Sequence, residues 1–134
     1  PTATGTPTMQ LVSATPITRG QRCELAFRLT DSATGKPLGP NDLTLLHTKK
    51  LHTMIVDSSL TDYHHLHPEY DADRGLFTCS FIPQLSSPYR AWHDFALTGA
   101  DKNIHLMNDL PAAHGAAVLF DIATVDRFDG PRVG

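Results

Sequence analysis

Histidine residues gather in one short stretch of the chain, KKLHTMIVDSSLTDYHHLHPEY, which spans residues 49–70 and holds four of the eight histidines. Imidazole nitrogens are common ligands of transition-metal ions, so this cluster suggests a metal site. Residues 50–57 and 63–69 have the composition of two β-strands, and residues 58–62 form a short polar turn between them. The stretch therefore predicts a hairpin with imidazole side chains on both strands.

The pairing register of this hairpin decides which histidines meet. If Asp57 pairs with Asp62, His52 lies opposite His67. A register shifted by one residue would instead place His52 on the same side as His64. Facing residues have Cβ atoms about 4.5–5.5 Å apart, close enough for two imidazoles to share one ion with bonds of about 2.0–2.1 Å. We favour the first register, in which His52 joins His65 and His67, a chelating pair that shares one face of its strand in either register.

Met54 lies two residues after His52 and shares its face of the strand. In the favoured register it faces His65, and the apolar pair of Val56 and Tyr63 supports this register. A thioether is a soft ligand that suits copper better than zinc. The alternative is that Met54 is an ordinary core residue and that the histidines line a partly exposed strand edge.

A second contribution to the site is expected from the segment PYRAWHDF. Trp92 and Asp94 share one face of this strand, and His93 lies on the other. Asp94 is a candidate ligand, or it accepts a hydrogen bond from a ligand imidazole and fixes its tautomer. His93 is the competing candidate, and its alternative is a buried polar group bonded to the backbone. His47 has the wrong parity to join His52 without a bulge. The roles of His64, His93, His105 and His114 stay open.

Short strands separated by turns indicate the fold. Ten prolines and nine glycines punctuate the chain, and few stretches have helical periodicity. About seven strands at this spacing predict an all-β, antiparallel β-sandwich of immunoglobulin-like or cupredoxin-like type. We expect one domain over residues 1–134, with loosely held termini at 1–8 and 127–134. The expected strands are 9–16, 21–31, 43–48, 50–57, 63–69, 76–84 and 89–97, with one or two more in the last part of 104–125.

The two cysteines, Cys23 and Cys79, alternate with apolar residues in their strands. Both are therefore expected to point toward the core. A disulfide between neighbouring strands and two buried thiols are both compatible with this pattern.

Composition restricts the partners. The formal net charge is −3 and no basic block is present, so we expect no binding to nucleic acid. No apolar run is long enough for a membrane span, so we expect no membrane insertion. No signal peptide is present. The start of the chain, PTATGTPT, looks like a mature terminus, so we do not take the missing signal peptide as favouring the cytoplasm.

Residues 43–95 resemble a known group of domains. The motifs HTKKLHTMIVDSSLTDYHHLHPE and PYRAWHDF are similar to those of YtkA-like, immunoglobulin-like β-sandwich domains that are secreted or periplasmic. Such domains commonly accompany proteins of bacterial copper and heavy-metal handling. The resemblance implies a periplasmic or secreted location and a metal-associated role. It places the histidines of the motif at His47, His52, His65 and His67, and its acidic residue at Asp94.

Three functions are compared. The first is an extracytoplasmic module that binds a metal, copper or alternatively zinc, in storage, transfer or sensing, with another envelope protein as a possible partner. Its ligands are His52, His65 and His67, with Met54 or Asp94 as a fourth. The second is a non-catalytic interaction domain with structural histidines. The third, a metal-dependent enzyme, ranks last because no catalytic constellation is recognisable, and we expect no enzyme.

Overall fold

Two antiparallel sheets make up the described part of the chain, which comprises residues 6–45, 49–99 and 103–111 of the computed structural model. The first sheet contains β1 (Pro7–Ala14), β2 (Cys23–Asp31), β3 (Pro37–Leu38), β7 (Glu69–Asp71) and β8 (Leu76–Phe81). The second contains β4 (Leu43–Thr44), β5 (Leu51–Asp57), β6 (Tyr63–Leu66), β9 (Tyr89–Leu97) and β10 (Ile104–Asp109). The predicted all-β class and the antiparallel sandwich arrangement are therefore confirmed.

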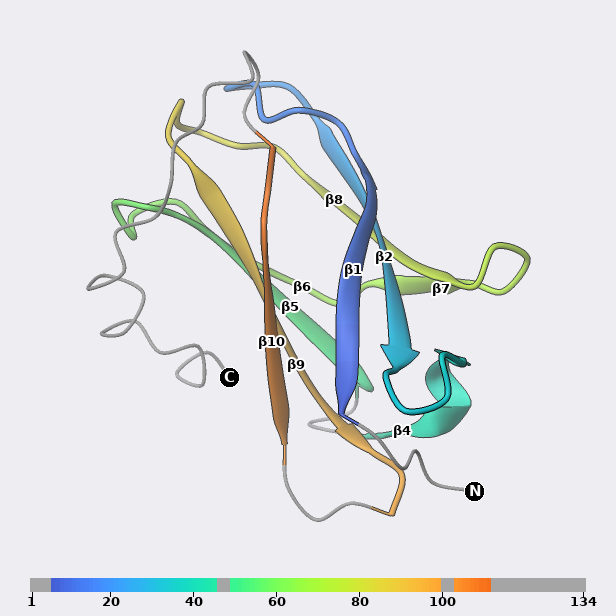
Figure 1. Ribbon diagram of the computed structural model, residues 1–134. Coiled ribbons are helices and arrows are strands. Elements are labelled where there is room, and N and C mark those ends of the chain that lie inside the picture. Colours follow the sequence, from blue (N-terminus) through green and yellow to red (C-terminus); the bar gives the residue numbers. More distant parts are fainter. Residues whose placement is uncertain (1–5, 46–48, 100–102, 112–134) are drawn as a thin grey trace.

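The order of the strands places β5 at the centre of the histidine-bearing sheet. The first sheet has the order β1-β2-β8-β7, with β3 beside β2, and the second has the order β10-β9-β5-β6, with β4 beside β9. Figure 1 shows the two sheets as layers, with β10 running alongside β1. One 3-10 turn, η1 (Pro40–Asp42), precedes β4. Across the described ranges, no helix has the length and apolar character to cross a bilayer.

The core lies between the two sheets and follows from period-2 alternation. On β2, Leu25, Phe27 and Leu29 are buried, and on β9 the rings of Tyr89 and Phe95 are fully buried. Because alternate residues of a strand face opposite sides, the odd-numbered residues of both strands form the core and the even-numbered ones face away from it. This alternation sends the residues of interest on β9, including Asp94, to the outer face.

The segment 63–69, expected as one strand, is divided between the two sheets. β6 pairs with β5 and ends at Leu66, and β7 begins at Glu69 and pairs with β8. Pro68 lacks an N–H group and restricts the residue before it, so pairing with β5 does not continue through this position. His67 therefore lies on the short crossing from one sheet to the other.

Two expectations about the termini are corrected or left open. β1 begins at Pro7, which pairs with Asp31, so residues 7 and 8 of the segment 1–8 belong to a sheet and are not loose. The pairing is explained by the apolar alternation of β1, which buries Met9. One strand, β10, lies at the start of the segment 104–125, where Ile104 begins a period-2 pattern. The strands expected in the last part of that segment, and the terminus 127–134, fall in residues 112–134, which lie outside the described residues.

The two cysteines are free thiols on neighbouring strands. Cys23 faces Phe81 and Cys79 faces Leu25, so the cysteines are diagonal rather than direct neighbours. Burial raises the pKa of Cys23 to about 11 and that of Cys79 to about 12. The Cys23 thiol donates a hydrogen bond to the carbonyl oxygen of Thr15, 3.1 Å away. Both side chains therefore stay un-ionised at neutral pH.

A buried carboxylate organises the turn of the histidine hairpin. Asp57 is fully buried, and its side chain accepts hydrogen bonds from the backbone N–H groups of Ser59, Thr61 and Asp62 at 2.8–2.9 Å. The hydroxyl groups of Ser59 and Ser87 also donate to it. Burial by itself would raise the pKa of Asp57, but these hydrogen bonds lower it below its ordinary value. The carboxylate thus fixes the loop that sets the register of β5 and β6.

Replacing Asp57 by alanine should destabilise the protein by about 3 kcal/mol, because several buried donors lose their charged acceptor. Urea unfolding followed by fluorescence measures this loss. Leu60, in the same turn, adopts a φ of 63°, a left-handed conformation that glycine tolerates better. Leu60→Gly is therefore the control and should leave stability unchanged or raise it. Equal losses in both variants would show that the turn is merely intolerant of substitution.

Candidate metal centre

The pairing of β5 with β6 has the register that the sequence favoured. Met54 faces His65 and Val56 faces Tyr63. On its other side β5 pairs with β9, so that Met54 also faces Trp92. The side chains on the outer face of the second sheet therefore form a regular array, and the register of the strands determines which of them are neighbours.

Three histidines of this array lie together. His52 on β5, His65 on β6 and His67 just after β6 each offer a ring nitrogen, and these atoms lie within 4.8 Å of one another. The ring centroids are 4.9–5.4 Å apart for the three pairs. His52 is 9% exposed, while the other two are exposed to solvent. The cluster thus has one ligand anchored in the sheet and two at its accessible edge.

The spacing of the nitrogens suits a shared metal ion. The Nδ1 atom of His52 and the Nε2 atom of His65 are 3.2 Å apart. Two nitrogens bonded to one ion at 2.0–2.1 Å in tetrahedral geometry would be separated by about 3.4 Å. Without an ion, one of these two rings donates a hydrogen bond to the other. The His52–His65 pair is therefore already spaced for a shared ion, whereas His67, whose nitrogen lies within 4.8 Å of the other two, would move closer to complete the site.

Two further candidates line the same small space. A cavity of about 10 Å³ lies between His52, Met54, His65, Trp92 and Asp94. Met54 is only 2% exposed although it lies outside the main core, and Asp94 faces His52 directly across β9 and β5. A thioether and a carboxylate thus flank the histidine cluster, and the indole of Trp92 lies beside the thioether.

The Asp94 carboxylate has an unsatisfied oxygen. Its Oδ1 atom is buried and has no hydrogen-bond partner among the described residues. His105, which faces Asp94 from β10, has its Nδ1 atom 3.3 Å from this oxygen, within the range of an ion pair. A buried carboxylate oxygen normally has a partner, so this atom is suited to a cation or to a protonated imidazole.

The electrostatics of the cluster favour neutral rings. Burial lowers the pKa of His65, as does the proximity of His52, and Asp94 opposes the shift. Burial also lowers the pKa of His67, together with its two histidine neighbours and Lys49. Since only a neutral imidazole coordinates a metal, these shifts keep the ligands available at neutral pH.

Several histidines fall elsewhere. His93 is fully buried on the core side of β9, and its nitrogens contact Thr53 and Asn108 at 2.9 Å each. It is therefore a structural residue held by two side chains. His64 lies on the core side of β6, with its Nε2 atom 2.9 Å from Asp62. His47 and His114 lie outside the described residues.

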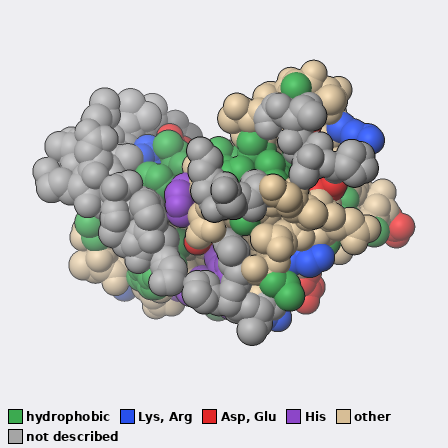
Figure 2. All heavy atoms as spheres, turned by 90° about the horizontal axis from the view of Figure 1, so that it is seen from below, with side chains coloured by type: hydrophobic (Ala, Val, Ile, Leu, Met, Phe, Trp, Pro, Cys, Tyr) green, Lys and Arg blue, Asp and Glu red, His purple; other side chains and the backbone are tan. Residues whose placement is uncertain are grey.

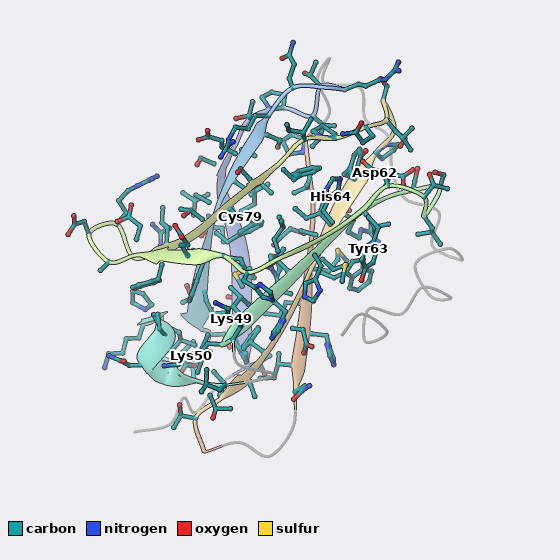
Figure 3. The ribbon with its side chains drawn as sticks, turned by 180° about the vertical axis from the view of Figure 1, so that it is seen from behind. Lys49, Lys50, Asp62, Tyr63, His64 and Cys79 are labelled. Carbon is teal, nitrogen blue, oxygen red and sulfur yellow. The ribbon has the colours of Figure 1, made fainter. Side chains whose placement is uncertain are left out.

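Sequence reasoning missed three neighbours of the site. It left His105 unplaced, although the alternation in residues 104–109 could have been aligned with β9. It also gave no role to Lys49 and Lys50, which lie just before β5 (Figure 3). On the end of the molecule that Figure 2 shows, histidine side chains reach the surface next to acidic and uncharged ones.

One family model matches this chain. It covers residues 2–110 and is described as a domain of unknown function, DUF8832. The chain belongs to the DUF8832 family. No curated protein and no solved structure matches it significantly. The family description assigns no activity, so inferences about this DUF8832 domain depend on its own residues.

Proposed function

We propose that this protein binds one transition-metal ion, copper in preference to zinc, through His52, His65 and His67. The observation that carries the proposal is the convergence of three ring nitrogens within 4.8 Å from two neighbouring strands and the crossing that follows. The lowered pKa values of His65 and His67 keep two of these ligands neutral. The proposed role is binding, in storage, transfer or sensing, and no reaction is assigned.

The preference for copper is argued from the groups around the triad. Met54 supplies a soft thioether, which suits the cuprous ion, and Asp94 supplies an oxygen that suits a cupric or zinc ion. Cuprous ions accept two or three ligands, and cupric ions prefer a tetragonal set of nitrogen and oxygen atoms. A site that offers both kinds of fourth ligand would hold copper in either oxidation state.

Location and finer fold type belong to the same proposal. A periplasmic or secreted location, an immunoglobulin-like or cupredoxin-like sandwich, and a partner in the cell envelope all rest on the resemblance of residues 43–95 to YtkA-like domains. The competing function is a domain that binds another protein. In that case His52 and His65 are a hydrogen-bonded structural pair with His67 beside them, and no metal is bound. Metal titration separates the two.

Titration of untagged protein with Cu²⁺, with Cu⁺ under reducing conditions, and with Zn²⁺ should give one saturable site per chain. The electron paramagnetic resonance spectrum of the Cu²⁺ form should show coupling to imidazole nitrogens. Binding that never saturates, or a spectrum without nitrogen coupling, would refute the proposal and leave the interaction domain as the better description.

Met54→Leu tests the copper preference. This exchange conserves side-chain volume at a buried position, so the fold should change by less than about 1.5 kcal/mol. Cuprous affinity should fall about tenfold through loss of the soft ligand, while zinc affinity should stay within about twofold. Competition with a chromophoric chelator measures both constants. A parallel loss for Cu⁺ and Zn²⁺ would indicate that Met54 only supports the histidines by packing.

A further inference from the structure

A second, larger cleft opens beside the histidine triad. It has a volume of about 260 Å³ and shares His67 with the triad. Its polar and aromatic walls are Lys49, Lys50, His67, Glu69, Tyr70 and Phe77. The cleft lies where the chain crosses from β6 to β7, at the point at which β5 begins. It is therefore open to solvent and adjoins one proposed ligand of the metal.

The walls of the cleft are held in place by packing. The ring of Tyr70 stacks at a tilt against Phe77, with centroids 4.9 Å apart. Gly39 makes room for the same ring, because a Cβ atom at this position would lie 3.0 Å from it. Lys50 donates a hydrogen bond to the carbonyl oxygen of Pro40 at 2.9 Å, which fixes its side chain at the rim. These contacts hold the walls of the cleft in a defined shape.

The charge of the cleft favours an anion. Among the described residues of its walls, Lys49 and Lys50 contribute two positive charges, and Glu69 contributes one negative charge. Lys50 uses one of its three N–H donors on Pro40 and retains two. Lys49 is near enough to His67 to contribute to the lowering of its pKa. Cationic donors and a metal ligand therefore face the same space.

We propose that this cleft binds a small dicarboxylate, with one carboxylate completing the coordination of the metal held by the triad and the other paired with Lys49 and Lys50. The inference rests on the proposed function, since the first carboxylate needs the ion. Three histidines leave a four-coordinate metal with one further position, for which the added carboxylate competes with Asp94, and a carboxylate oxygen is a suitable ligand for a cupric ion. The protein would then receive or release its ion as a carboxylate complex.

Succinate is the probe, and butyrate, which has the same carbon chain and a single carboxylate, is its matched control. Calorimetric titration of the Cu²⁺-loaded protein should show tighter binding of succinate than of butyrate. Lys49→Gln should weaken succinate binding about fivefold, the effect of losing one partly exposed ion pair, and should leave butyrate binding unchanged. Lys36→Gln changes the net charge equally on an exposed residue outside the cleft, so it should have no effect.

Glu69→Gln gives a prediction of opposite sign. Removing the negative charge of Glu69 should strengthen succinate binding, by about twofold to fivefold. Equal affinities for succinate and butyrate, or an unchanged succinate affinity in Lys49→Gln, would overturn the inference. Copper titration without any carboxylate is measured first, so that each cleft variant is saturated with copper before the acid is added. A protein that fails to bind copper overturns both proposals, whereas one that binds copper but does not discriminate the two acids overturns only this one.

Discussion

Replacing both His65 and His67 by alanine should lower copper affinity by about a thousandfold and leave the metal-free fold intact. Residues that only orient a metal ligand typically contribute about 10–100-fold to affinity. The loss of two direct ligands should therefore lower the affinity by more than the loss of one such orienting residue. Both side chains are exposed, so their removal leaves no cavity in the core. Chelator competition at pH 7 measures the affinities, and circular dichroism checks the fold.

Thermal stability gives a second measure of the same loss. Free copper at about a thousandfold above its dissociation constant should stabilise the wild-type protein by about 4 kcal/mol and the double variant by almost nothing. His105→Ala is the matched control, because His105 is an exposed histidine on the same face that lies outside the triad. Its copper affinity should fall by no more than about 10–100-fold, the effect typical of a residue that orients a ligand, against about a thousandfold for the double variant. Loss of binding in His105→Ala equal to that in the double variant would refute the assignment of ligands.

The histidine hairpin was predictable because its strands carry their own register signals. The apolar pair of Val56 and Tyr63 favoured one alignment, and that alignment is observed. The turn itself was read only as polar. The sequence did not reveal that the Asp57 carboxylate accepts hydrogen bonds from the backbone N–H groups of the turn, because these bonds require the side chain to point into the turn.

What the sequence could not give were relations between distant strands. The position of Asp94 opposite His52 depends on β9 lying next to β5, and no local pattern specifies that neighbour. The division of residues 63–69 between two sheets was also missed, although Pro68 marks the place. His67 lies at this division. A prediction that treats residues 63–69 as one strand therefore could not include the cleft beside His67.

His93 illustrates how a histidine outside the metal cluster supports the fold. The Nε2 atom lies 2.9 Å from the amide oxygen of Asn108, so it must carry the proton and donate it. The Nδ1 atom then accepts from the hydroxyl of Thr53, also at 2.9 Å. Asn108 in turn donates to the carbonyl oxygen of Met9 on β1, at 3.1 Å. This chain of hydrogen bonds links the second sheet to the first and requires a neutral imidazole.

His93→Phe should destabilise the protein by about 2–4 kcal/mol at pH 7, measured by urea unfolding. Phenylalanine has a similar shape and can retain the edge contact with Phe27, at a centroid distance of 4.5 Å in the wild type. The loss therefore comes from leaving the hydroxyl of Thr53 and the amide of Asn108 unpaired. Adding Thr53→Val removes one of these orphaned groups and should recover about 1 kcal/mol or more. No recovery would mean that the aromatic ring itself does not fit.

The same variant tests the protonation state. Burial lowers the pKa of His93 to about 4, although the hydrogen bond from Nε2 to Asn108 opposes the shift. Above about pH 6.5 the residue is neutral in both the folded and unfolded chain and contributes no pH dependence. Between about pH 6.5 and 4, His93 is protonated in the unfolded chain but stays neutral in the folded one. The free energy of unfolding of the wild type therefore falls by about 1.4 kcal/mol for each unit by which the pH is lowered.

The stability gap between wild type and His93→Phe should therefore narrow by about 2 kcal/mol from pH 7 to pH 5, because the variant lacks this proton. His65 and His67, whose pKa values are also lowered, are present in both proteins, so their contributions cancel in the difference. A gap that stays constant would mean that the folded protein accepts the proton at His93. The sheets would then be joined by an imidazolium, with Thr53 turned to present its oxygen rather than its hydrogen.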